Sequence, residues 1–87
     1  MAKVVVGRHA RHEFERLDWV LSDAIWEAVL MLGYEPFAGG ALRGRFLGLR
    51  SLRVGVYRVI YELRDGDKTV RVLAVRHRSV AYDSDPR

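Results

Sequence analysis

The hydrophobic pattern of this chain changes its period once, close to Gly39 and Gly40. Before this pair, apolar residues recur at spacings of three and four, which is the pattern of amphipathic helices. After it, the apolar runs are rich in β-branched and aromatic residues, which are typical of strands. Helices followed by strands, rather than alternating with them, predict an α+β fold.

The first half is predicted to contain one strand and two helices. Val4–Val6 is a short apolar run before Gly7, and we expect it to form a buried strand. Helical spacing covers residues 8–17 and then 19–32. The short linker between these segments predicts a helical hairpin, and Gly33 stands where the second helix should end.

The second half is predicted to form an antiparallel three-stranded meander. After a loop over residues 37–42, strands are expected at 46–54, 57–63 and 69–75. Residues 64–67, Arg-Asp-Gly-Asp, suit a tight hairpin turn. We therefore expect an N-terminal strand, a two-helix hairpin and a meander, with the helices packed on one face of the sheet.

The hairpin turn also predicts which residues share a face of the sheet. If Gly66 and Asp67 are the loop residues, Glu62 lies opposite Arg71, which pairs opposite charges across the strands. The same register pairs Ile60 with Leu73 and Arg58 with Val75. The face under the helices would carry Tyr57, Val59, Tyr61, Leu63, Val70, Val72 and Ala74. The other face would carry Arg58, Ile60, Glu62, Leu73, Val75 and His77.

Length and composition restrict the class of protein. A chain of 87 residues supports one hydrophobic core, so we expect a single domain over residues 1–87. The absence of cysteine excludes disulfides and thiolate metal sites. The N-terminal apolar run, Val4–Val6, is too short for a signal peptide or a membrane span, so a cytoplasmic protein is expected. His9 and His12 are one helical turn apart without a third ligand, and we expect neither a metal nor a cofactor.

The basic residues are concentrated in the second half of the chain. Residues 43–78 carry ten basic and three acidic side chains, whereas residues 1–42 carry four basic and six acidic ones. Thirteen of the fifteen basic residues are arginine, whose planar guanidinium suits phosphate groups and stacks on bases. This distribution favours a nucleic-acid partner, although codon bias alone also enriches arginine.

Two segments carry a family resemblance that extends over nearly the whole chain. Residues 52–61 read Leu-Arg-Val-Gly-Val-Tyr-Arg-Val-Ile-Tyr, and residues 75–78 read Val-Arg-His-Arg, followed by Tyr82. This pattern resembles the RelE/ParE toxin superfamily, and the length and order of elements match as well. The resemblance implies a toxin of a type II toxin–antitoxin system, with a neighbouring gene that encodes an acidic antitoxin.

The superfamily has two mechanisms. RelE-type toxins cleave mRNA on the ribosome without a metal, and ParE-type toxins inhibit DNA gyrase and need no nuclease site. The resemblance is closer to the RelE type, so an endoribonuclease acting on mRNA and the ribosome is expected first. A gyrase inhibitor, or an inactive homologue that only binds its antitoxin, remains the alternative.

Four residues match the catalytic positions that the resemblance implies. Arg58 and Arg78 would stabilise the negative charge that develops on the phosphate, since arginine stays protonated. His77 and Tyr82 are the candidate proton carriers, and Tyr82 is also a candidate platform for a base. The competing interpretations are a surface arginine paired with a carboxylate, a structural histidine, and a tyrosine that packs on its own sheet.

The remaining arginines of the basic half are candidate contacts to the RNA backbone or to acidic antitoxin residues. They are Arg43, Arg45, Arg50, Arg53 and Arg76. One departure from the RelE-type pattern affects the chemistry. Where the best-known nuclease has lysines before the Tyr-Arg motif, this chain has Leu49 and Ser51, which cannot donate or accept a proton as lysine does.

Overall fold

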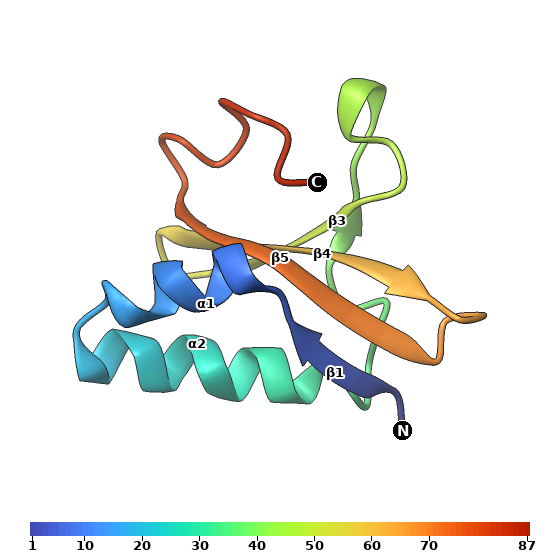
Figure 1. Cartoon of the computed structure of the whole chain (residues 1–87), viewed down its shortest axis with the longest axis horizontal. Coiled ribbons are helices and arrows are strands. Elements are labelled where there is room, and N and C mark those ends of the chain that lie inside the picture. The colour runs from blue at the N-terminus through green and yellow to red at the C-terminus, as the bar shows by residue number, and fades with distance from the viewer.

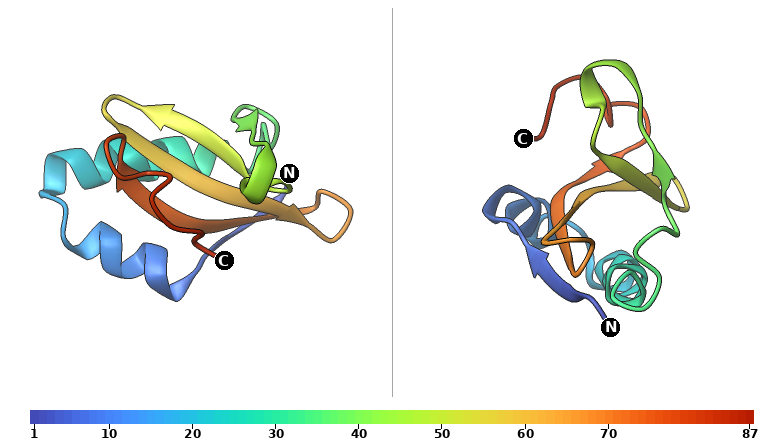
Figure 2. Two further views of the ribbon diagram at one scale, coloured as in Figure 1. Left: turned by 90° about the horizontal axis from the view of Figure 1, so that it is seen from above. Right: turned by 90° about the vertical axis from the view of Figure 1, so that its right-hand side faces the viewer.

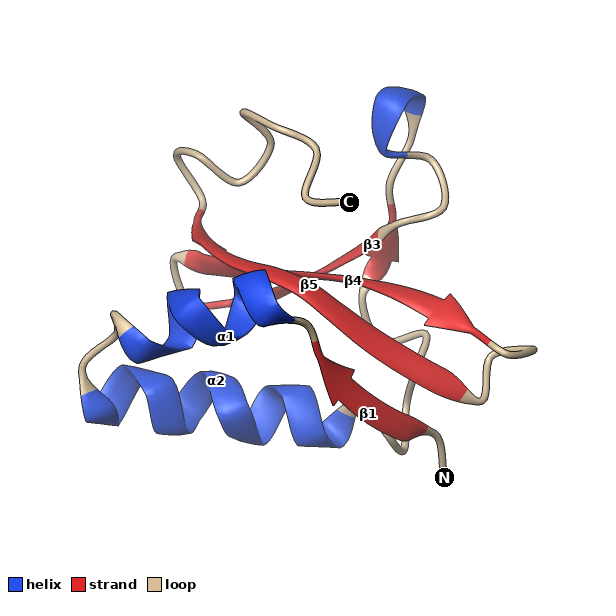
Figure 3. Cartoon of the chain, in the orientation of Figure 1, coloured by secondary structure: helices blue, strands red, loops and turns tan.

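The computed structural model describes residues 1–87 and contains a five-stranded sheet with two helices on one face (Figure 1). The strand order is β1-β5-β4-β3-β2. The strands are β1 (Lys3–Val6), β2 (Gly40–Ala41), β3 (Arg50–Val54), β4 (Tyr57–Arg64) and β5 (Thr69–His77). The helices are α1 (Arg8–Glu15) and α2 (Trp19–Met31), with a short 3-10 turn, η1, at Gly44–Phe46. The predicted α+β class, with helices on one face, is confirmed (Figure 3).

Local signals account for the helical hairpin. Asp18 precedes α2, and its carboxylate accepts the Leu21 N–H at 3.0 Å, which satisfies a free donor of the first turn. The C-cap of α2 is Leu32, and Gly33 follows it as predicted. Gly33 packs so closely on the N-terminal segment that a Cβ there would lie 3.1 Å from the Ala2 carbonyl oxygen. Neither helix has both the length and the apolar content that a membrane span requires.

The sheet separates two apolar clusters. Its helix side contains the larger one, made of Ala2, Ala10, Ile25, Val29, Leu32, Val59, Tyr61, Val70, Val72 and Val75. We call the opposite side the outer face. Its cluster of Leu49, Ile60, Leu73 and Ala74 is covered by Leu42, Phe46 and Tyr82. The cover comes from the loop before β3 and from the segment after β5, which lie over the outer face (Figure 2).

Two predictions about the strands were wrong in part. The strand expected at 46–54 begins only at Arg50, because Gly44 and Gly48 adopt positive φ angles of 64° and 94° that an extended strand excludes. The sheet is also larger than the predicted meander. The N-terminal strand pairs in parallel with β5, and Gly40–Ala41 adds a short strand beside β3.

The predicted register holds for only part of the β4–β5 hairpin. Glu62 lies opposite Arg71 as expected. Beyond Tyr61 and Val72, Leu73 is an extra residue in β5, and this β-bulge shifts every later pair by one position. Ile60 therefore pairs with Ala74 instead of Leu73, Arg58 with Arg76 instead of Val75, and Tyr57 with His77. Because one extra residue reverses the alternation, Ala74 joins the outer cluster and Val75 joins the helix-side core, opposite to the prediction.

Candidate nucleic-acid interface

Three arginines stand side by side on the outer face. Arg53 of β3 pairs with Arg58 of β4, and Arg58 pairs with Arg76 of β5. Paired strands lie about 4.8 Å apart, so the three side chains leave the sheet as neighbours. We call Arg53, Arg58 and Arg76 the arginine row. Like charges directly opposite each other are unfavourable, and such a row therefore favours a bound anion.

The three arginines of the row differ in how many ion pairs and hydrogen bonds their side chains form with the rest of the chain. Arg76 has a side chain only 11% exposed, lies 3.7 Å from a Glu13 carboxylate oxygen and donates to the Ser84 carbonyl at 2.8 Å. Arg53 donates to the Gly55 carbonyl at 3.3 Å. Arg58 is half-buried and takes part in none of the four ion pairs of the chain. Arg53 and Arg58 therefore both lack a counterion, and Arg58 is the member whose side chain forms neither an ion pair nor a hydrogen bond within the chain.

Arg78 lies at the same end of the sheet as the row. Its backbone N–H donates to the Val56 carbonyl at 2.7 Å, which holds the chain beside the β3–β4 turn. Its side chain is exposed and forms no ion pair within the chain. The structure thus brings together Arg53, Arg58, Arg76 and Arg78 of the residues predicted from the sequence.

Tyr82 covers the middle of the outer face. Its phenol donates to the Ser51 hydroxyl at 3.0 Å, and its ring lies 5.6 Å from the ring of Phe46. Ser51 and Leu49 are both buried, at 7% and 1% exposed. The two positions where the nuclease pattern has lysines are therefore occupied by apolar packing and by a hydroxyl that holds Tyr82.

His77 lies on the face opposite to Arg58. The bulge at Leu73 turns it to the helix side, where its ring makes an edge contact with Tyr57 at 5.6 Å between centroids. Its Nδ1 lies 2.8 Å from the Ser79 hydroxyl and accepts the Ser79 N–H at 3.2 Å. The prediction that His77 shares a face with Arg58 was wrong, and the structure does not bring these two residues together.

Arg43, Arg45 and Arg50 lie outside the row. Arg50 is on the helix side, where it donates to the Gly39 carbonyl at 2.6 Å and stacks over Phe37. Arg45 stacks over Phe46 at 4.9 Å and donates to the Tyr82 carbonyl at 2.8 Å. Arg43 is exposed and precedes η1. Arg50 and Arg45 thus hold loops in place, and Arg43 alone of the three is unengaged.

A second contact ties the end of the chain to the same loop. Arg87 donates to the carbonyl oxygens of Leu47 at 2.9 Å and Arg45 at 2.7 Å. Its guanidinium also binds the Asp85 carboxylate at 2.9 Å. The hydrogen bonds from Arg87 lower the pKa of Asp85, and the same pairing raises the pKa of Arg87. The carboxylate is stabilised in its charged form, which favours the docked segment at neutral pH.

Comparison with known proteins identifies the family. The sequence model described as the ParE toxin of the type II toxin–antitoxin system, parDE, matches residues 5–82. This chain belongs to the RelE/ParE toxin superfamily. Toxin RelE of Mycobacterium tuberculosis is 32% identical over 85 residues, which cover 95% of this chain and 88% of that toxin. The predicted resemblance is confirmed, and the protein is a toxin of a type II toxin–antitoxin system.

Solved structures of toxin–antitoxin complexes share the fold. In the RelBE2 complex from Mycobacterium tuberculosis, the matched chain has a TM-score of 0.82 and 33% identity, with 88% of this toxin and 98% of that chain covered. In the archaeal RelE–RelB complex from Pyrococcus horikoshii, the TM-score is 0.74 and the identity 27%, with 92% and 98% covered. Both similarities extend over nearly the full length of the toxin.

One residue that supports the site was not predicted from the sequence. Glu13 of α1 accepts the Val75 N–H at 2.8 Å and lies beside Arg76. The Glu13 carboxylate takes the place of a partner strand at the edge of β5, beyond the point where the pairing with β1 ends. No local pattern in the sequence connects Glu13 with residues more than sixty positions away. Only the packing of α1 against β5 reveals that this carboxylate is the counterion of the row.

Proposed function

We propose that this toxin is a metal-independent, ribosome-dependent endoribonuclease that cleaves mRNA in the cytoplasm. The observation that carries the proposal is the half-buried Arg58, which has no counterion and stands between two other arginines. A phosphodiester supplies the anion that this arrangement lacks, and guanidinium groups bind phosphate with two parallel hydrogen bonds. Arg78 adds an exposed cation at the same end of the sheet.

The reaction consists of attack by the ribose 2′-hydroxyl on the adjacent phosphate. The phosphate gains negative charge in the transition state, and the 5′-oxygen leaves and takes up a proton. Arg58 and Arg78 would stabilise the added charge, and one such donor is worth about a hundred- to a thousand-fold in rate. Tyr82 is the favoured proton carrier because it lies on the outer face with Arg58, whereas His77 does not.

Primer extension on cellular RNA after brief induction of the toxin tests this proposal. We expect new cleavage ends within translated reading frames, and we expect them to disappear in Arg58→Ala. Arg16→Ala is the matched control, because Arg16 is an exposed arginine at the C-cap of α1, away from the arginine row. If the ends persist in Arg58→Ala, the role of Arg58 in cleavage is refuted.

One observation favours the alternative of a gyrase inhibitor. Leu49 and Ser51 supply no proton carrier, and the Tyr82 phenol is already hydrogen-bonded to Ser51. A toxin that only binds its target needs the arginines and not the proton transfer. Arrested growth with intact transcripts would support gyrase inhibition. Loss of DNA supercoiling by gyrase in the presence of the toxin would establish it. Intact transcripts with normal growth would indicate a homologue that only binds its antitoxin.

We also propose an acidic antitoxin, encoded nearby, as the protein partner. The M. tuberculosis and P. horikoshii relatives were both solved as toxin–antitoxin complexes. Helix α2 supports a protein partner, because its exposed side is largely apolar, interrupted only by Asp23 and Glu27, while its other side buries Ile25 and Val29. Its exposed apolar side chains are Trp19, Val20, Trp26, Leu30 and Met31. The basic outer face offers the charge that an acidic segment would meet.

A further inference from the structure

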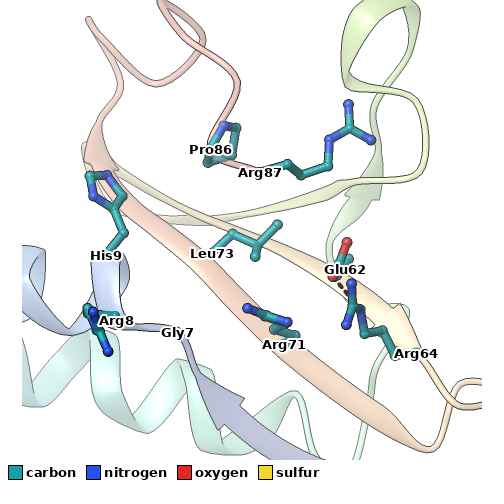
Figure 4. A pocket seen from close by; sticks show the side chains of 9 residues that line it. All are labelled: Gly7, Arg8, His9, Glu62, Arg64, Arg71, Leu73, Pro86 and Arg87. Carbon is teal, nitrogen blue, oxygen red and sulfur yellow. Dashed lines mark ion pairs between the residues drawn. The ribbon is translucent and has the colours of Figure 1, made fainter.

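A second basic cluster lies on the outer face, at the end of the sheet away from the arginine row. Residues of α1, β4, β5 and the C-terminal segment line a cleft there of about 330 Å³ (Figure 4). Four arginines and a single carboxylate, that of Glu62, contribute to the lining. The arginines are Arg8, Arg64, Arg71 and Arg87.

Two of these arginines are neutralised and two are not. Arg64 lies 2.6 Å from the Glu62 carboxylate, and Arg87 binds Asp85. Arg8 and Arg71 take part in none of the ion pairs of the chain. The cleft therefore carries an excess of two positive charges that no carboxylate of the protein offsets.

Arg71 is the member whose hydrogen bonding is incomplete. It lies directly opposite Glu62 in the β4–β5 ladder, yet the Glu62 carboxylate pairs with Arg64 instead. The Nε of Arg71 is buried from solvent and has no acceptor. Figure 4 shows this side chain between Glu62 and Arg64 on one side and Arg8 and His9 on the other. A buried donor without an acceptor is unfavourable, so an anion that enters the cleft gains a hydrogen bond.

The start of α1 adds positive potential to the same cleft. Gly7, Arg8 and His9 line it, and no side chain caps the first N–H groups of this helix. The N-terminus of a helix carries a partial positive charge and presents free N–H donors, and both favour an anion. The helix start and the unpaired Arg71 thus point to one class of ligand.

We propose that this cleft binds a phosphate group of the RNA strand whose cleavage is proposed at the arginine row. The inference rests on that proposed function. Arg71 is level with Glu62, four residues along β4 from Arg58, which is about 13 Å at 3.3 Å per residue. The rings of Tyr82 and Phe46 lie on the same face. One strand can therefore place one phosphate at the row and a later one at Arg71, with stacking surface between them.

Fluorescence anisotropy with a short 2′-O-methyl RNA, which cannot be cleaved, tests the site on the full chain. Arg71→Gln should weaken binding by about tenfold and lower the slope of log affinity against log salt by about 0.7, because one phosphate contact is lost. Glu62→Gln should tighten binding, because it removes the only carboxylate of the cleft. Tighter binding by Glu62→Gln could not result from misfolding, because a misfolded variant would lose affinity for the RNA. Arg16→Gln controls for the change in net charge and should stay within about twofold.

The outcomes separate this inference from the proposed function. If the toxin does not bind the free RNA at all, the assignment of the cleft to RNA is overturned, whereas ribosome-dependent cleavage is decided separately by primer extension. If Arg58→Gln weakens binding while Arg71→Gln matches Arg16→Gln, the cleft is refuted and the RNA-binding row stands. Poly-glutamate provides the last comparison. If Arg71→Gln weakens poly-glutamate binding as strongly as RNA binding, the cleft serves an acidic protein segment, and the assignment to RNA is refuted.

Discussion

Arg58 lies directly opposite Arg76 across β4 and β5, and this pairing exists because Leu73 is an extra residue in β5. A regular ladder would place Val75 opposite Arg58 and would turn Arg76 to the helix side. With the bulge, Arg53, Arg58 and Arg76 stand in one row, and Glu13 is the one carboxylate that pairs with it. The fold thus holds together cations that repel one another, and like charges held close together are common at functional sites.

Replacing Arg58 should separate stability from activity. Arg58→Ala removes a half-buried cation from between two others, so we expect the free energy of unfolding to stay constant or rise by up to about 0.5 kcal/mol. Growth inhibition should be lost in the same variant. Urea denaturation and growth assays measure the two quantities, with Arg16→Ala as the control. A loss of more than about 1 kcal/mol would show that Arg58 acts in folding instead.

The hydrogen bond between Tyr82 and Ser51 allows a paired test of the proposed proton carrier. Tyr82→Phe and Ser51→Ala both remove this bond, and each should cost about 0.5–1.5 kcal/mol of stability. Only Tyr82→Phe removes the phenol. We therefore expect cleavage to be lost in Tyr82→Phe and retained in Ser51→Ala, as measured by primer extension. Equal cleavage by the two variants would assign Tyr82 to packing alone.

Glu13 should stabilise the end of β5 through both carboxylate oxygens. Glu13→Ala leaves the Val75 N–H and the Arg76 guanidinium without their acceptor, and we expect a loss of about 2–3 kcal/mol. Glu13→Gln keeps one acceptor and should lose less, about 1 kcal/mol. Urea unfolding checks both values. If the two variants lose the same stability, the bulk and the acceptor that glutamine keeps contribute nothing, and the negative charge of Glu13 accounts for the whole loss.

Alanine substitution should destabilise the protein at Gly39 and have little effect on stability at the adjacent Gly40. A Cβ at Gly39 would lie 2.7 Å from the Tyr61 hydroxyl and 2.8 Å from the Ser51 carbonyl, so Gly39→Ala should cost about 1–3 kcal/mol. A Cβ at Gly40 would meet nothing within 4 Å, and Gly40→Ala should change stability by less than about 1 kcal/mol. Thermal unfolding compares them. A similar loss in both variants would contradict the close approach of Tyr61 to Gly39.

The sequence was informative wherever the determining interactions are local. The change of hydrophobic period predicted helices before strands, and both helices begin at the expected residues, Arg8 and Trp19. The turn predicted that Glu62 faces Arg71, and the Tyr-Arg motif predicted the family. Each of these depends on residues close together in the chain, where spacing and side-chain type are sufficient.

Features that depend on distant segments could not be predicted in this way. The strand expected from Phe46 begins at Arg50, because glycine backbone angles and the packing of Phe46 under Tyr82 favour a turn. Arg50 was expected at the RNA, yet the loop at Gly39 folds over β3 and binds its guanidinium. In both cases the competing partner comes from another part of the chain.

The sequence by itself determined the α+β class, the family and the set of arginines available for an anion. The tertiary structure decided which of these arginines lie next to one another. One extra residue at Leu73 put Arg76 beside Arg58 and turned His77 away, since side chains alternate with a period of two along a strand. Parallel pairing of β1 with β5 brought Glu13 to Arg76 and the start of α1 to Arg71. These contacts join residues far apart in the chain, and only the packed fold specifies them.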